Sequence, residues 1–142
     1  MRSKFTSLVS IKKDIMQKSE RALQSANMTL KNAKETLELS YDALSEIETP
    51  TNGYIADFIA SRTLLDSQRS LIKHNEEWVT YAQEQVKLAK ERLRVDMLEY
   101  EKFKYLHLEE VKKVLKAQKI KESKALDEVA LMSFNRKNRT TF

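Results

Sequence analysis

The stretch EIETPTNGYIADF, residues 46–58, contains the only proline and the only glycine of this 142-residue chain. Pro50 lacks an N–H group and disfavours a helical conformation at Thr49. Asn52 and Gly53 tolerate the positive φ angles that a tight reversal needs. A single long helix, kinked here and paired with another chain, is the alternative. The Pro-x-Asn-Gly cluster favours a full reversal.

Apolar residues recur every seven positions on both sides of this stretch. Before it the core row is Val9, Met16, Leu23, Leu30, Leu37 and Leu44; after it the row is Phe58, Leu65, Ile72, Val79, Val86, Leu93, Tyr100, His107 and Val114. A spacing of seven stays on one stripe of a helix only if that stripe supercoils left-handedly. Two rows of this length are typical of coiled coils.

The second heptad position is mostly small or polar in both segments. Before the reversal it is occupied by Phe5, Lys12, Ser19, Ala26, Ala33, Ser40 and Ile47; after it, by Ser61, Gln68, Asn75, Ala82 and Ala89. The sequence therefore predicts an all-α fold, an antiparallel two-helix coiled-coil hairpin forming one domain over residues 1–142. Its expected parts are a helix over about 4–48, a turn over about 49–53, a helix over about 54–128 and a basic tail over about 132–142.

The second predicted helix is much longer than the first. Antiparallel pairing about the turn places Phe5 near residue 100, so the rest of the second helix overhangs. Apolar residues nevertheless continue along it at helical spacing: Tyr100, Phe103, Leu106, Val111, Val114 and Leu115. An exposed apolar stripe usually marks an interaction surface. Fraying of the second helix, or a first helix that begins lower along the pair than assumed here, is the alternative interpretation.

Charge is unevenly distributed along the chain, whose net charge is +5. From Glu35 through Ser61 there are acidic residues but no Lys or Arg, whereas lysines predominate from Lys112 to Lys124. The turn end is thus acidic and the opposite end basic, which suggests different partners for the two ends. A solvated charged face is the simpler alternative.

The sequence gives no support for catalysis, so we expect no enzyme and no cofactor. The chain has no cysteine, and its two histidines, His74 and His107, lie far apart without metal-ligand spacing. No phosphate-binding loop or dinucleotide fingerprint is present, and no segment is apolar enough for an integral membrane helix. The lysines cover more than one helix face and no groove-reading module is recognisable, so nucleic-acid binding is not favoured.

Two terminal segments carry a family resemblance. SKALDEVALMSFNRK, residues 123–137, resembles the Lys-x-Leu/Met-Asp-Glu-x-Ala segment of the FliJ family of the flagellar type III export apparatus, and FTSLVSIKKDIMQKSERAL, residues 5–23, is similar to the opening of that family. The resemblance implies a cytoplasmic protein, peripheral to the inner membrane at the flagellar base. It also implies three partners: the hexameric export ATPase, the cytoplasmic domain of the export-gate membrane protein, and substrate chaperones.

The same resemblance, together with the overhang, implies two sets of partner-binding residues. The expected ATPase-end residues are Phe5, Phe103, Leu106, Val111, Leu115, Lys124, Asp127 and Glu128; the expected gate-end residues are Leu37, Tyr41, Phe58 and Leu65. The expected oligomeric state is a monomer or weak dimer. A homodimeric structural coiled coil and a basic protein that binds nucleic acid or a membrane surface are the rival hypotheses.

Overall fold

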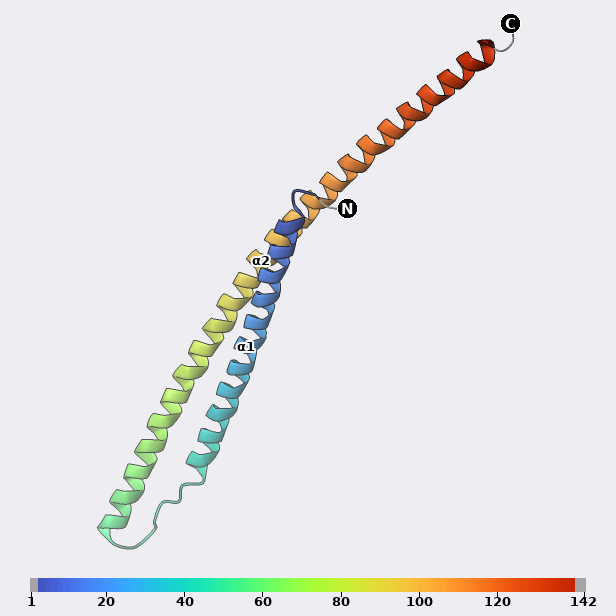
Figure 1. The fold of residues 1–142 in the computed structure, drawn as a ribbon. Coiled ribbons are helices and arrows are strands. Elements are labelled where there is room, and N and C mark those ends of the chain that lie inside the picture. The colour runs from blue at the N-terminus through green and yellow to red at the C-terminus, as the bar shows by residue number, and fades with distance from the viewer. Residues whose placement is uncertain (1–2, 140–142) are drawn as a thin grey trace. The chain divides into compact units, whose positions relative to one another are not determined.

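The computed structural model describes residues 3–139, which form two helices and no strand. Helix α1 spans Thr6–Ser45 and helix α2 spans Ile55–Arg139, and they run in opposite directions in the all-α hairpin that the sequence predicts (Figure 1). Helix α2 continues beyond the expected end near residue 128, because neither Gly nor Pro occurs after Gly53 to stop it. The basic tail is therefore helical as far as Arg139, and its residues 140–142 lie outside the described part.

The chain divides into two compact units, and both helices contribute to each. The loop unit comprises Ile15–Met97. The terminal unit comprises Met1–Asp14 and Leu98–Phe142, of which residues 3–14 and 98–139 are described. Each unit is considered separately below.

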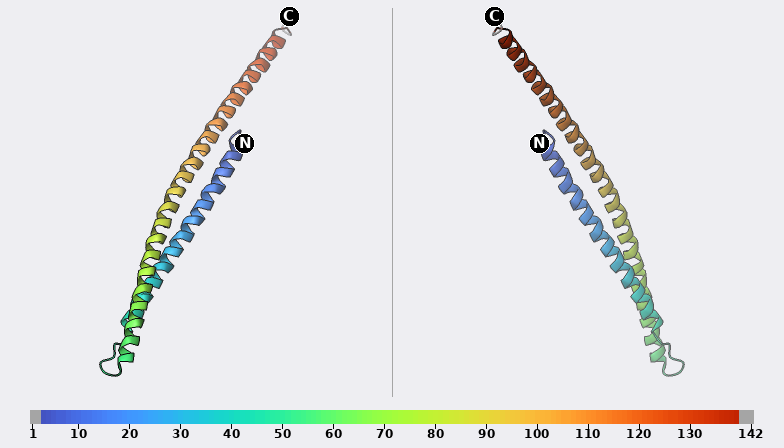
Figure 2. Two further views of the ribbon diagram at one scale, coloured as in Figure 1. Left: turned by 90° about the vertical axis from the view of Figure 1, so that its left-hand side faces the viewer. Right: turned by 90° about the vertical axis from the view of Figure 1, so that its right-hand side faces the viewer.

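In the loop unit, the two helices lie side by side along the predicted heptad rows (Figures 1 and 2). Ala33 and Ala82, at 2% and 1% exposure, form a core cluster with Val79, and Leu30 and Leu37 pack against this cluster. Small side chains at the second heptad position let the helix backbones approach closely, and the larger core-row residues then flank the contact. The predicted seam is confirmed, and its most buried members are the small ones.

Polar side chains fix the register of the helices in the loop unit. The buried Ser19 hydroxyl donates a hydrogen bond to the buried carboxylate of Asp96, and Arg92 Nε lies 3.3 Å from the same carboxylate oxygen. Gln68 Nε2 donates to the backbone oxygen of Ser40 at 2.9 Å. Sliding one helix along the other would take Ser19 away from the buried Asp96 carboxylate, which would then keep only Arg92 on its own helix, and losing a hydrogen bond to a buried charged group is unfavourable. These contacts therefore select one alignment among those that the heptad rows allow.

The reversal lies in residues 46–54, between the two helices. Gly53 has a φ of 135°, whereas no other described residue has a positive φ. Helix α2 then begins with a cap, in which the carboxylate of Asp57 accepts a hydrogen bond of 3.4 Å from the backbone N–H of Tyr54. Its negative charge also suits the positive end of the helix dipole.

In the terminal unit, Ser3 caps the start of α1. Ser3 Oγ accepts a hydrogen bond from the N–H of Phe5 at 3.1 Å, and Thr6 Oγ1 accepts one from the N–H of Ser3 at 2.8 Å. This reciprocal pattern is a capping box with Thr in the place of the usual Glu. Ser3 Oγ also lies 2.6 Å from Nδ1 of His107 on α2. The cap is thereby joined to the facing helix.

Beyond these contacts, α2 continues without cover. Every described side chain from Lys112 to Asn138 is exposed. The overhanging carboxy-terminal helix is therefore present in the structure, although it begins later than Phe103, which the sequence-based expectation included in it.

We expect Leu30→Asp or Val86→Asp to unfold the loop unit, because each places an unpaired carboxylate between the helices at a cost of more than about 3 kcal/mol. The exposed neighbours Lys31 and Lys87 provide matched controls, whose change to Ala should stay within about 0.5 kcal/mol. Urea denaturation followed by circular dichroism measures both sets. Equal losses in the two sets would show that the heptad register is wrong.

Gly53→Ala should destabilise the hairpin by about 1–2 kcal/mol, since an L side chain is strained at this φ. A Cβ at this position would also lie 3.2 Å from Oδ2 of the capping residue Asp57. Asn52→Ala is the matched control and should have a much smaller effect. Thermal melts that ranked the two variants in the opposite order would contradict this account of the loop.

Candidate functional site

The candidate sites are exposed surfaces, one in each unit. Among the described residues, no group of three or more His, Asp or Glu side chains is placed to hold a metal ion. Neither helix, within the described residues, has a segment long and apolar enough to cross a membrane.

The terminal unit brings Phe5 and Phe103 together, with ring centroids 6.4 Å apart and tilted by 46°. Lys12 and Lys102 place their ammonium groups 5.6 Å and 5.5 Å from the Phe103 centroid, and Lys4 lies 5.3 Å from that of Phe5. Cation–π attraction of this kind holds the positive charges around the aromatic pair. The two phenylalanines thus form a half-buried helix contact with a basic rim.

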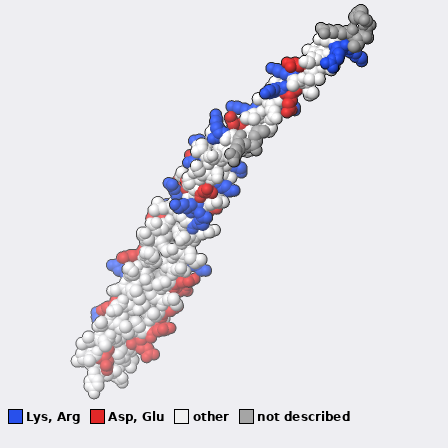
Figure 3. All heavy atoms as spheres, in the orientation of Figure 1, with Lys and Arg blue, Asp and Glu red and all other residues white. Residues whose placement is uncertain are grey.

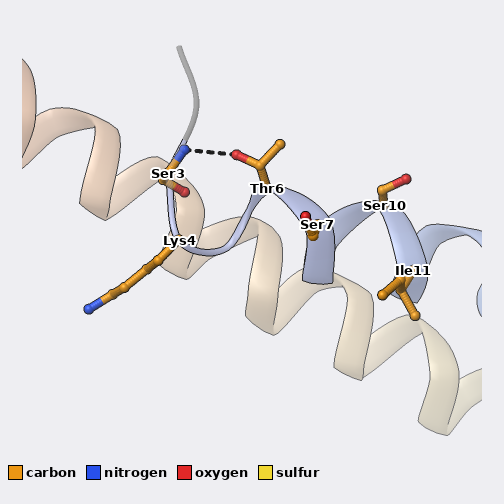
Figure 4. A pocket seen from close by; sticks show the side chains of 6 residues that line it. All are labelled: Ser3, Lys4, Thr6, Ser7, Ser10 and Ile11. Atoms are coloured by element: carbon orange, nitrogen blue, oxygen red, sulfur yellow. Dashed lines mark hydrogen bonds between the residues drawn. The ribbon is translucent and has the colours of Figure 1, made fainter.

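A hollow next to this contact is lined by the first turns of α1 (Figure 4). Its lining residues are Ser3, Lys4, Thr6, Ser7, Ser10 and Ile11. These six residues supply hydroxyls and one ammonium.

The other expected ATPase-end residues follow along α2. Leu106 and Val111 are half-buried, whereas Leu115, Lys124, Asp127 and Glu128 are exposed. The structure therefore spreads this set from a packed aromatic contact to a fully exposed helix. Sequence reasoning did not select the large apolar residues of the exposed part, although their helical spacing was visible: Leu126, Val129, Leu131, Met132 and Phe134.

The gate-end residues of the loop unit do not form one cluster. Leu37 packs against the core, and Leu65 is half-buried. Tyr41 lies one turn beyond Leu37, and its hydroxyl donates a hydrogen bond of 2.5 Å to Glu76 on α2. Phe58, which is 40% exposed, lies in the first turns of α2. Residues 58 and 76 are about 27 Å apart along a helix, so Tyr41 and Phe58 present separate patches.

Charged side chains mark the two units differently (Figure 3). In the loop unit, the acidic residues close to the reversal are all exposed: Glu35, Glu38, Asp42, Glu46, Glu48 and Asp57. In the terminal unit, exposed lysines follow α2 from Lys112 to Lys124. The prevailing charge is thus negative near the reversal and positive along this part of α2.

The hydrogen bond to Glu76 raises the pKa of Tyr41 above its ordinary value of 10.0. The stabilisation linked to this shift is present below pH 10.0 and is lost as pH rises through the higher pKa of the folded protein. Glu76→Gln should lower the Tyr41 pKa, since it removes the carboxylate charge. An ultraviolet titration, with Tyr41→Phe to identify the Tyr41 signal, measures the change. An unchanged titration in Glu76→Gln would contradict the role of this hydrogen bond.

One of three comparisons with known proteins identifies a family for this chain. No curated protein and no solved structure matched the chain. A family profile described as "Flagellar FliJ protein" matches residues 1–139, almost the full length. The chain therefore belongs to the FliJ family of flagellar proteins.

Proposed function

We propose that this protein of the flagellar export apparatus is a non-enzymatic adaptor with two binding surfaces. The terminal unit binds the hexameric export ATPase and promotes assembly of its ring. The loop unit binds the cytoplasmic domain of the export-gate membrane protein, so that the adaptor couples the ATPase to the gate. The observation that carries the proposal is the family match over residues 1–139.

The exposed carboxy-terminal part of α2 supports the assignment of the ATPase surface. Large apolar side chains remain half or more exposed there, including Leu126 at 69% and Met132 at 65%. Exposing apolar area costs about 25 cal/mol per Å², so a partner that covers it gains that free energy. A ring of subunits with acidic or mixed side chains in its lumen would also complement the lysines from Lys112 to Lys124.

The loop unit supports a second and different partner. Tyr41 is 46% exposed beside the acidic residues of α1, and Phe58 offers a second aromatic side chain on α2. Exposed aromatics next to charged groups are typical of binding hot spots. The acidic surroundings favour a basic patch on the gate protein. In this proposal the protein also engages export chaperones, and it acts in the cytoplasm at the flagellar base.

Two variants test whether the surfaces act separately. Removing residues from Lys116 onward deletes part of the exposed helix and leaves Phe5, Phe103 and Ser3 in place, so ATPase stimulation should fall to background while gate binding persists. The double change Tyr41→Ala and Phe58→Ala should weaken gate binding on the order of tenfold or more and leave ATPase stimulation intact.

The measurements are ATPase activation and binding of the purified gate domain, each with a thermal melt to show that the variant is folded. Lys87→Ala, on an exposed position away from both surfaces, is the matched control and should retain both activities. A folded variant that lost both activities would contradict the model of two separate surfaces.

A further inference from the structure

One flank of the helix pair in the loop unit has no charged side chain over a long distance. This flank, the uncharged flank, consists of the positions one before and two after each core-row residue. On α1 it comprises Ala22, Ser25, Thr29, Asn32, Thr36, Leu39 and Ala43; on α2 it comprises Ala60, Leu64, Ser67, Leu71, His74, Trp78, Tyr81, Gln85 and Leu88. In a chain with 33% charged residues, such a run is not a solvated face.

The opposite flank shows the contrast. It consists of the positions one after and four after each core-row residue, and over the same stretch it carries nine charged side chains: Lys31, Lys34, Glu38, Arg62, Asp66, Arg69, Lys73, Glu76 and Lys87. Figure 3 shows a broad expanse of the loop unit without blue or red side chains, bordered by acidic residues. Of the two flanks beside the seam, only one therefore carries charged side chains over this stretch.

Large and small side chains are also segregated on the uncharged flank. Helix α2 supplies large apolar side chains that are 45–55% exposed: Leu64, Leu71, Trp78, Tyr81 and Leu88. The rings of Trp78 and Tyr81 stack with centroids 5.3 Å apart. Helix α1 supplies mainly small side chains, and a hollow between the helices is lined by Thr29, Asn32, Thr36, His74 and Trp78, with Ala33 and Asn75 at its floor.

The two threonine hydroxyls of this flank on α1 already have partners within the helix. Thr29 Oγ1 donates to the backbone oxygen of Ser25 at 3.0 Å, and Thr36 Oγ1 donates to that of Asn32 at 2.9 Å. Covering these two threonines would therefore leave neither hydroxyl donor unpaired, which removes their share of the cost of burying polar groups.

We propose that the uncharged flank is the contact surface for a second copy of this chain, which forms a two-fold symmetric four-helix bundle. With the two-fold axis parallel to the helices, α2 of each copy packs on α1 of the other. Large side chains then meet small ones at the same level, and Trp78 of one copy enters the hollow at Thr29 and Thr36 of the other. Neighbouring helices are antiparallel throughout, as in common four-helix bundles.

The size and charge of the flank fit this occupant. A stretch of about 29 residues on α2 and two helix widths give a face about 40 Å by 20 Å, on the order of 800 Å² per copy. That area is typical of stable protein–protein interfaces. A two-fold interface must be self-complementary, and an uncharged face places no like charges opposite one another across the two-fold axis.

Sedimentation of the full chain over a wide concentration range tests the proposal. The wild type should form a dimer, and Trp78→Glu should raise its dissociation constant on the order of 100-fold while circular dichroism stays unchanged. Ile59→Glu is the matched control, because Ile59 is an apolar α2 residue, 61% exposed, on the opposite flank of the helix pair. It should dimerise like the wild type. A wild type that stays monomeric, or a control that dissociates equally, overturns the proposal.

Cysteine cross-linking tests the arrangement of the helices in the dimer. The chain has no cysteine of its own, so every disulfide reports on the introduced positions. Asn32→Cys on α1 and His74→Cys on α2 both lie at the central hollow. Mild oxidation of a mixture of the two variants should produce covalent dimers that contain one of each. Either variant alone should give few covalent dimers. In the proposed packing each cysteine faces a helix of the second copy that carries no cysteine in that variant. Equal cross-linking of each variant with itself would overturn the proposed packing.

Discussion

The close approach of α1 and α2 at Ala33 and Ala82 is the constraint on which the remaining structure depends. Two helices alone cannot enclose a thick core, so the best-buried side chains of the loop unit are small or lie directly in the seam. The larger residues beside the seam remain partly exposed to solvent. A narrow seam also needs polar contacts to specify its alignment, and the Ser19–Asp96 hydrogen bond provides one.

The same narrowness explains why the candidate sites are surfaces and not pockets. Side chains that would be buried in a globular domain, such as Trp78 and Leu126, face outward here. Exposure of each outward apolar patch to water costs free energy, and a macromolecule that covers the patch removes that cost. In the proposed function, the different charges of the two units then select which partner binds which unit.

Much of the fold follows from residue spacing. Core rows of period seven predict the seam, and the Pro50–Gly53 stretch predicts the reversal, because only these residues interrupt the helical pattern. The end of α2 was harder to predict. Helix propensity changes gradually where no Gly or Pro intervenes, so the basic tail continued the helix to Arg139.

The candidate site was less predictable for a related reason. Spacing assigns a residue to a face, but the level at which it meets the other helix depends on loop length and local contacts. Tyr41 therefore meets Glu76 and not the region of Phe58, and His107 meets the cap of α1. The places of Leu37 and Leu65 in the seam did follow from the core rows. A core row assigns a residue to the seam without specifying which residue of the other helix it faces.

The separation in sequence between contacting residues has a consequence for how the chain folds during synthesis. Ser3 meets His107 across 104 positions, whereas the loop unit needs nothing beyond Met97. As the chain leaves the ribosome, the loop unit can pair its helices first, starting beside the reversal where the closing loop is shortest. The first turn of α1, although synthesised earliest, must wait for the arrival of Phe103 and His107 before its cap and aromatic contact form. The start of α1 is thus synthesised before the rest of the hairpin and is among the last parts of it to form its contacts.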